Sequence, residues 1–266
     1  MNWWWAYLAL GAFVGFFSGL LGVGGGAVIV PILTLIFVSK QLAPNHVVHI
    51  ALGTAMATIL FTSASSIVSH HRRRAVNWHM LRDLVPGIVL GTFCGAVLAG
   101  HLNALVLGIL FAAVVYFSAT QLLLDIKPKT DRRLPGTAGM WLAGGAIGAL
   151  SSLAALAGAS LTVPFLVGRN VRVHEAIGTA AAVGWPLAFA GTVGYVVSGL
   201  GAVGLPDHSV GFVYLPAVLW IAIASVIMAP LGASVAHRIP GRTLKRIFAL
   251  LLYALATRML WSLLQH

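Results

Sequence analysis

Residues 15–33 read GFFSGLLGVGGGAVIVPIL and hold four glycines within the five residues 22–26. Such a run does not favour continuous helix, because each glycine in a helix interior costs about 1 kcal/mol relative to alanine. Apolar residues flank the run on both sides. The stretch therefore predicts a break between two apolar helices, with a short second helix that starts at the glycines.

The composition of the whole chain indicates a membrane protein. Of its 266 residues, 59% are hydrophobic and 8% are charged, whereas soluble domains carry about 25% charged residues. Many apolar segments approach the roughly 20 residues that cross the hydrocarbon core of a bilayer. We predict an all-α fold, a polytopic transmembrane helical bundle that forms a single membrane domain over residues 1–266. The predicted apolar segments are 4–21, 26–38, 48–70, 78–100, 104–125, 138–157, 159–168, 175–199, 211–236 and 245–264.

The charge and the motifs exclude several function classes. The net charge of +11 lies in short loops between apolar segments, which the positive-inside rule explains without nucleic acid as a partner. The single cysteine, Cys94, excludes an internal disulfide and a cysteine-based metal site. The sequence contains no HExxH, GxSxG or GxxxxGK[ST] motif. We expect no enzyme activity, no cofactor and no bound metal.

The glycine-rich stretch occurs twice. GFFSGLLGVGGGAVIVPIL from Gly15 aligns with GALSSLAALAGASLTVPFL from Gly148. Later pieces, HIALGTA in the first half and HEAIGTA in the second, match in the same order. This self-similarity predicts two repeats, 1–126 and 138–266, joined by the basic linker KPKTDRRLP.

The loop charges of the two repeats are opposite. HHRRR in the first half corresponds to SGLGAVGLPDHS, which has no Lys or Arg, and uncharged GHLN corresponds to the basic HRIPGRTLKR. The positive-inside rule then predicts inverted repeats. Two consecutive repeats are inverted only if each half crosses the membrane an odd number of times. We therefore predict that 4–38 and 138–168 are hairpins that return to the side they enter from, and that three spans follow each hairpin. Every Lys and Arg except Lys40 and Arg258 then lies on the cytoplasmic side, with both termini outside; whether the hairpins span fully or re-enter stays open.

The first hairpin tip is a candidate anion site. The free N–H groups and the positive dipole end of the helix after the tip favour an anion, and broken helices near the midplane form the sites of many inverted-repeat transporters. The alternative is a packing interface of small residues. The predicted substrate-binding residues here are Gly22, Gly24, Gly25 and Gly26.

The second tip has fewer glycines and more hydroxyls. Gly158 and Ser160 lie at this tip, and Ser151 and Ser152 precede it. Gly158, Ser160, Ser151 and Ser152 are all predicted to bind the substrate; for Ser151 and Ser152 the alternative is that their hydroxyls bond backbone carbonyls of their own helix.

A threonine recurs in the Gly-Thr-Ala step of both repeats. Thr54 and Thr179 are predicted to line the substrate cavity, with interhelical hydrogen bonding as the alternative. The acidic residues all fall in loops or near predicted span ends. A cavity lined by N–H and hydroxyl donors without carboxylates prefers anions.

GLLGVGGGAVIVPIL, SSLAALAGASLTVPFL and the ALGTA and AIGTA steps resemble the sulfite exporter TauE/SafE family over nearly the whole chain. The resemblance implies an inner-membrane permease for sulfite or related organosulfur anions. Ala157 and Ala159 stand where the family has glycine, and Ala55 and Ala180 where it has serine. The family's motifs fall on Gly22, Gly24, Gly25, Gly26 and Pro31, on Ser151, Ser152, Gly158 and Pro164, and on Gly53-Thr54 and Gly178-Thr179; the two prolines take a structural role.

The sequence thus predicts a secondary transporter in the inner membrane. Its expected cargo is a small anion, and export of sulfite or a small organosulfonate is the specific prediction; a passive anion channel is the alternative. The lipid bilayer is the expected surrounding partner. Coupling to an ion such as H+ and homo-oligomerisation both stay open.

Overall fold

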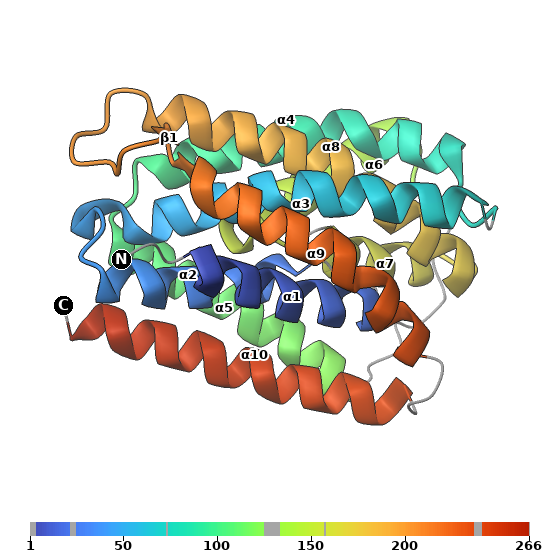
Figure 1. Ribbon diagram of the computed structural model, residues 1–266. Coiled ribbons are helices and arrows are strands. Elements are labelled where there is room, and N and C mark those ends of the chain that lie inside the picture. The colour runs from blue at the N-terminus through green and yellow to red at the C-terminus, as the bar shows by residue number, and fades with distance from the viewer. Residues whose placement is uncertain are drawn as a thin grey trace.

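The computed structural model describes residues 4–21, 25–72, 74–124, 134–156, 158–236 and 241–265, and these residues are mostly helical (Figure 1). Predicted positions Gly22 and Gly24 lie outside this part of the chain. In chain order the elements are α1 (Trp4–Leu21), α2 (Gly26–Ser39), the 3-10 helix η1 (Pro44–His46), α3 (Val47–Arg72), α4 (Trp78–Gly100), α5 (Ala104–Leu124), α6 (Thr137–Ala154), α7 (Ala159–Val167), α8 (Val173–Gly199), β1 (Ser209–Val210), β2 (Val213–Tyr214), α9 (Leu215–Ala236) and α10 (Gly241–Leu264).

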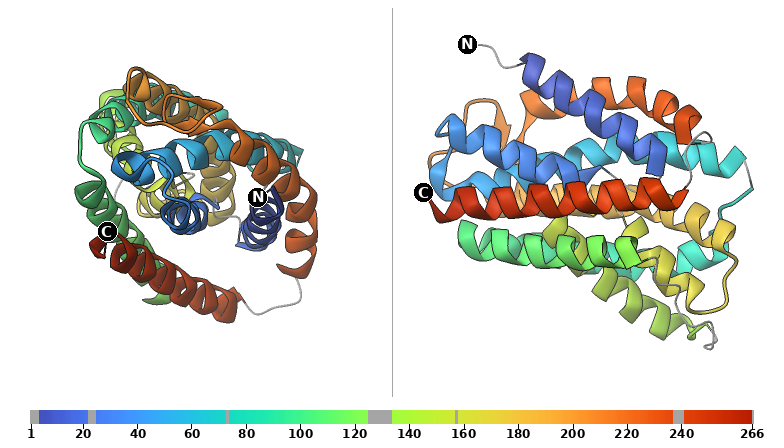
Figure 2. Two further views of the ribbon diagram at one scale, coloured as in Figure 1. Left: turned by 60° about the vertical axis from the view of Figure 1, so that its left-hand side comes forward. Right: turned by 90° about the horizontal axis from the view of Figure 1, so that it is seen from below.

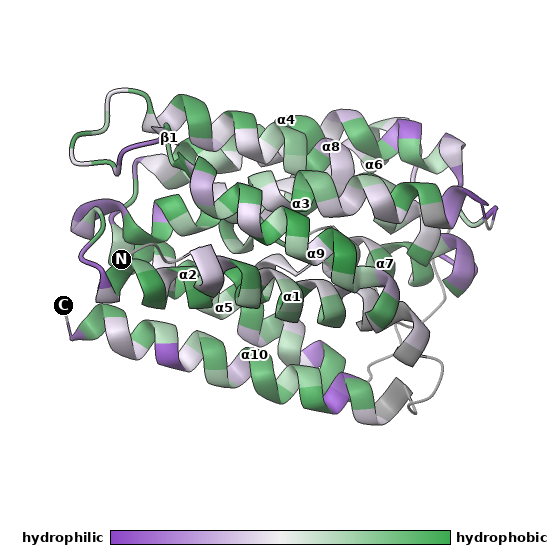
Figure 3. Cartoon of the chain, viewed as in Figure 1, coloured by the Kyte–Doolittle hydropathy of each residue, from purple (hydrophilic) through white to green (hydrophobic). Residues whose placement is uncertain are grey.

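Seven stretches of the described residues are long and apolar enough to cross a membrane, namely those of α3, α4, α5, α6, α8, α9 and α10. Hydrophobic residues run along the helices, whereas hydrophilic residues gather mainly at the two ends of the bundle (Figure 3). The predicted fold class, a polytopic helical membrane protein, is confirmed.

The two predicted breaks are present, and each divides a hairpin of two helices. The α1–α2 hairpin enters from the end of the bundle that carries both termini, and the α6–α7 hairpin enters from the opposite end (Figures 1 and 2). The order of a two-helix hairpin followed by three long helices occurs in both halves. This order and the opposite directions of the hairpins support the inverted-repeat interpretation; the repeat boundaries stay a prediction.

The first helix of each half packs against a long helix of the other half: α1 runs along α9, and α6 runs along α4. Glycines permit this close approach. A Cβ added at Gly15 would lie 2.4 Å from the carbonyl oxygen of Ser225, and one added at Gly91 would lie 2.1 Å from that of Gly145. Small residues generally let membrane helices approach closely, so Gly15 and Gly91 serve helix packing.

The central helices α3 and α8 are the most buried of the candidate spans. They pack against each other, and α5 packs with α10 on one side of the bundle (Figure 2). Tyr116 of α5 stacks on Tyr253 of α10 with ring centroids 5.4 Å apart. α3 and α8 therefore form the centre of the bundle.

Two helix starts lie four residues from the predicted positions: α10 begins at Gly241 rather than at 245, and the start of α9 is displaced the other way. The apolar segment 211–236 was expected to be helical throughout, but α9 begins at Leu215 and residues 209–214 form the β1–β2 hairpin. Gly211 has a φ of +54°, in the left-handed region, and a Cβ there would lie 2.2 Å from the carbonyl oxygen of Val196. The hairpin turn packs directly on α8, which excludes a helical start.

Candidate functional site

The first break ends in a glycine pair at the start of α2. Gly25 caps the helix, and its carbonyl accepts hydrogen bonds from the N–H groups of Val28 and Ile29, both at 3.0 Å. Gly26 is buried, and a Cβ added to it would lie 1.9 Å from the carbonyl oxygen of Ala155. Ala155 ends α6 at the second break. The structure thus brings the tips of the two hairpins into direct backbone contact.

The second break uses the left-handed backbone region twice. Ala155 has a φ of +47° and Gly158 a φ of +75°. Gly158 precedes α7, and its carbonyl accepts hydrogen bonds from the N–H groups of Leu161 and Thr162 at 3.3 and 2.8 Å. Glycine suits this position because it adopts positive φ without a steric penalty.

The two serines before the second break have different surroundings, although both are fully buried. The Ser152 hydroxyl donates to the carbonyl of Ala149 at 2.7 Å, so for this residue the backbone-bonding alternative is realised. Its own carbonyl accepts a hydrogen bond from the Tyr195 hydroxyl at 2.9 Å. The Ser151 hydroxyl has no hydrogen-bond partner among the described residues.

Further buried hydroxyls near this hairpin are also unpartnered. Thr162, in α7, and Thr92, on α4 beside α6, are fully buried, and neither hydroxyl has a partner within the described residues. A Cβ at Gly148 would lie 2.7 Å from the Thr92 hydroxyl oxygen. Buried polar groups almost always find a partner in the protein or in ordered water. Ser151, Thr162 and Thr92 thus carry buried hydroxyls without a partner among the described residues; Ser160 adds a half-buried hydroxyl in the first turn of α7.

The two repeated threonines hold connecting segments. The hydroxyl oxygen of Thr54 accepts the N–H of Tyr214, and that of Thr179 accepts the N–H of Asn77, both at 3.0 Å. Tyr214 immediately precedes α9 and Asn77 immediately precedes α4, so each threonine binds the other half of the chain. Both hydrogen bonds are of the kind given as the alternative to cavity lining, in which the threonines join separate helices. Each half of the chain holds the other half in the same way.

The prolines Pro31 and Pro164 lie inside α2 and α7. Among the described acidic residues, Asp83 and Glu175 lie in the first two turns of α4 and α8, and Asp207 lies in the connection between α8 and α9. Within the described residues, no group of three or more His, Cys, Asp or Glu side chains could hold a metal ion. The described surroundings of the breaks therefore offer backbone and hydroxyl donors.

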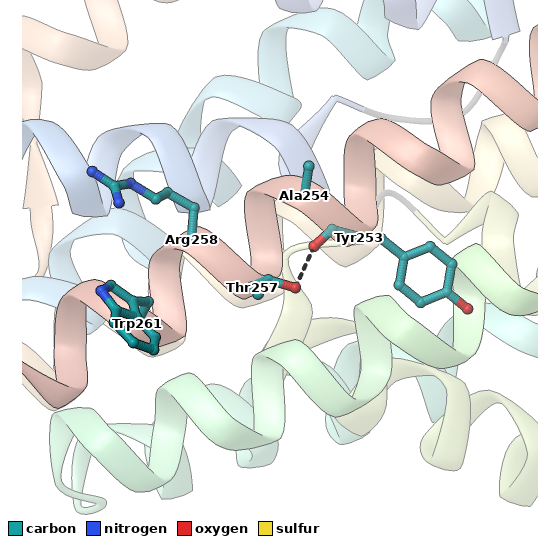
Figure 4. A pocket seen from close by; sticks show the side chains of 5 residues that line it. All are labelled: Tyr253, Ala254, Thr257, Arg258 and Trp261. Carbon is teal, nitrogen blue, oxygen red and sulfur yellow. Dashed lines mark hydrogen bonds between the residues drawn. The ribbon is translucent and has the colours of Figure 1, made fainter.

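A cavity of about 530 Å³ lies elsewhere, along α10 (Figure 4). Its lining side chains all belong to this helix: Tyr253, Ala254, Thr257, Arg258 and Trp261. The Thr257 hydroxyl donates to the carbonyl of Tyr253 and pairs with the Tyr116 hydroxyl at 2.7 Å. A groove formed by one helix face does not enclose a substrate.

This arrangement of long spans and two opposed broken hairpins defines a polytopic membrane transporter. The chain matches the family described as sulfite exporter TauE/SafE over residues 7–259, and it belongs to that family. A "Probable membrane transporter protein" of Haemophilus influenzae is 37% identical over 254 residues, covering 95% of this chain and 96% of the relative. "Probable membrane transporter protein YdhB" of Bacillus subtilis is 34% identical over 116 residues, covering 42% of this chain and 43% of the relative. No solved structure matches the chain significantly.

Sequence reasoning did not identify Asn77 and Tyr195, which hold α4, α6 and α8 together. The Asn77 side chain accepts the N–H of Met80 at 3.1 Å, as a helix N-cap does. Asparagine before an apolar helix is a recognisable N-cap signal, so this role could have been found. Tyr195 lies in an apolar segment, where no local pattern reveals its bond to Ser152.

Proposed function

We propose that this protein is a secondary transporter that exports a small anion, sulfite or a small organosulfonate, across the inner membrane. The observation that carries the proposal is the contact between two helix breaks, at Gly26 and Ala155, inside a TauE/SafE family transporter. Broken helices that meet inside a bundle of inverted repeats are the usual place for a transporter's substrate.

The chemistry around the breaks supports an anionic substrate. The first N–H groups of α2 and α7 have no acceptor within their own helices, and the dipole of each helix places partial positive charge at its start. Buried, unpartnered hydroxyls of Ser151 and Thr162 lie on either side of the second break. Together these groups offer several hydrogen-bond donors and no described carboxylate.

We also propose the sidedness. α3, α7 and α9 end at the same end of the bundle, opposite the chain termini (Figure 1). Together with the linker after α5 and the helix residues next to them, these connections carry most of the Lys and Arg residues, so the positive-inside rule assigns that end to the cytoplasm. Moving one negative charge out of an inside-negative cell gains about 2.3 kcal/mol per 100 mV. The membrane potential therefore favours export of an anion, and coupling to an ion such as H+ stays open.

An anion panel in proteoliposomes tests this function, with imposed pH and voltage gradients. The proposal predicts saturable movement of sulfite or methanesulfonate that responds to voltage. Large single-channel currents would identify a passive channel instead. Failure of folded, reconstituted protein to move any anion of the panel would refute the proposal.

A further inference from the structure

A second cavity, of about 410 Å³, opens at the bundle end that we assign to the cytoplasm. It lies between the connection from α3 to α4 and the start of α8. The side chains that define its chemistry are those of Arg74, Asn77, Trp78, Arg172, His174 and Glu175. None of them belongs to the candidate site at the hairpin tips.

The charge of this cavity is predominantly positive. Arg74 and Arg172 face it from two different connections, and neither guanidinium has a hydrogen-bond or ion-pair partner among the described residues. Both α4 and α8 begin at the cavity, which adds the partial positive charge of two helix starts. Glu175 supplies the one carboxylate in the lining.

That carboxylate is already engaged. The side-chain amide of Asn77 donates to the Glu175 carboxylate. The side-chain oxygen of Asn77 accepts the backbone N–H of Met80, and the backbone N–H of Asn77 donates to the Thr179 hydroxyl. Asn77 thereby joins the starts of α4 and α8 and fixes the position of Glu175. Among the described residues, no group takes up the donors of the two guanidiniums.

The opposite end of the bundle is built differently. There the Thr54 hydroxyl holds the segment before α9, as Thr179 holds the segment before α4. Phe212 in this segment is 1% exposed and packs on His46 and His49 at centroid distances of 5.2 and 5.0 Å. Aromatic packing thus occupies the region that corresponds to the arginine-lined cavity.

We propose that the cavity between Arg74 and Arg172 is a capture site for a small oxyanion of the sulfonate or sulfite class. The proposal rests on the proposed function for its biological meaning. A guanidinium presents paired N–H donors that match two oxygens of one anion, and a charged cleft raises the local concentration of oppositely charged ligands. The cavity then loads anions from the side on which export begins.

Charge-selective thiol labelling tests the site without requiring transport. Val76 lines the cavity, so Val76→Cys in a Cys94→Ser background is the reporter, in phosphatidylcholine nanodiscs that contain no anionic lipid. The sulfonatoethyl and trimethylammonioethyl methanethiosulfonates are compared, each rate divided by that for a free thiol. We expect the anionic reagent to be favoured about tenfold or more, the lower end of electrostatic focusing.

Arg172→Gln and Arg74→Gln should each reduce this preference several-fold. Arg246 is a basic residue that the positive-inside rule assigns to the same side of the membrane, but it does not line the cavity. Arg246→Gln should therefore leave the preference for the anionic reagent unchanged. Millimolar methanesulfonate should protect the reporter saturably, and only while both arginines are present. His174→Cys provides a second reporter if Val76→Cys does not fold.

Equal rates for the two reagents would overturn the proposal, as would a loss of preference in Arg246→Gln equal to that in Arg172→Gln. Protection that is unsaturable or independent of the arginines would also overturn it. Charge selectivity and protection with no transport in proteoliposomes would leave the capture site standing and refute only the proposed function. Transport in proteoliposomes without charge-selective labelling would refute the capture site and leave the proposed function standing.

Discussion

The contact between the hairpin tips predicts a strong effect of one added methyl group. In Gly26→Ala the new Cβ would lie 1.9 Å from the carbonyl oxygen of Ala155 and 2.7 Å from Cδ1 of Ile59. Carbon–oxygen contacts normally lie at about 3.3 Å, so the two backbones must separate by about 1.4 Å. The oxygen belongs to the backbone and cannot rotate away as a side chain can.

We expect this separation to damage transport more than folding. Overpacking of this kind costs about 1–3 kcal/mol, which a bundle of long helices can absorb. A substrate held between the tips loses contacts on one side, and a tenfold fall in affinity corresponds to about 1.4 kcal/mol. The assay is the concentration dependence of anion uptake in proteoliposomes, together with the melting temperature of the purified protein.

Gly145→Ala is the matched control. It adds the same methyl group to α6, but the nearest atom would be the carbonyl oxygen of Gly87 at 3.8 Å, an ordinary contact. The control should transport normally. Uptake by Gly26→Ala equal to that of the control, at unchanged half-saturation, would refute the inference that the tips bind the substrate.

The other predictions concern stability and sidedness. Thr54→Val and Thr179→Val each leave a backbone N–H without its acceptor and should destabilise the protein by about 1–3 kcal/mol. Thr54→Ser and Thr179→Ser keep the hydroxyl and should retain stability. Unchanged melting temperatures of the valine variants would contradict this role. Tyr195→Phe removes the hydrogen bond to Ser152 and should cost about 1 kcal/mol in thermal unfolding; unchanged melting would contradict this. In Cys94→Ser protein, cysteines at positions 40 and 205 should react from outside the cell and one at 72 from inside; the opposite pattern would overturn the assigned orientation.

The helices and breaks were predictable because their causes are local. Hydropathy predicted α1 at 4–21 and α2 at 26–38, and the structure has Trp4–Leu21 and Gly26–Ser39. The glycine content of residues 22–26 predicted the end of one helix and the start of the next. The distribution of Lys and Arg predicted the hairpins. Only an odd number of membrane crossings in each half places the basic loops on one side of the membrane and the neutral loops on the other.

The contacts that complete the site were less accessible from the sequence. Thr54 and Thr179 bond residues 160 and 102 positions away, and the alternatives of cavity lining and interhelical bonding fit the same apolar pattern. Arg74 and Arg172 satisfy the positive-inside rule wherever they lie, so their shared cavity left no local signal. The start of α9 was misplaced because hydropathy alone does not separate residues 211–214 from the apolar helix that follows; Phe, Val and Tyr favour strand, and Gly211 packs on α8.

The most direct test of the central claim measures exchange of radiolabelled sulfite by proteoliposomes that contain the wild-type chain or Gly25→Leu. A Cβ at Gly25 would already lie 2.0 Å from Cγ1 of Val14, so leucine must displace the tip of the first hairpin. We predict saturable exchange by the wild type and by Gly145→Ala, and loss of exchange in Gly25→Leu with normal membrane insertion. Normal exchange by inserted Gly25→Leu would contradict the assignment of the anion site to the hairpin tips.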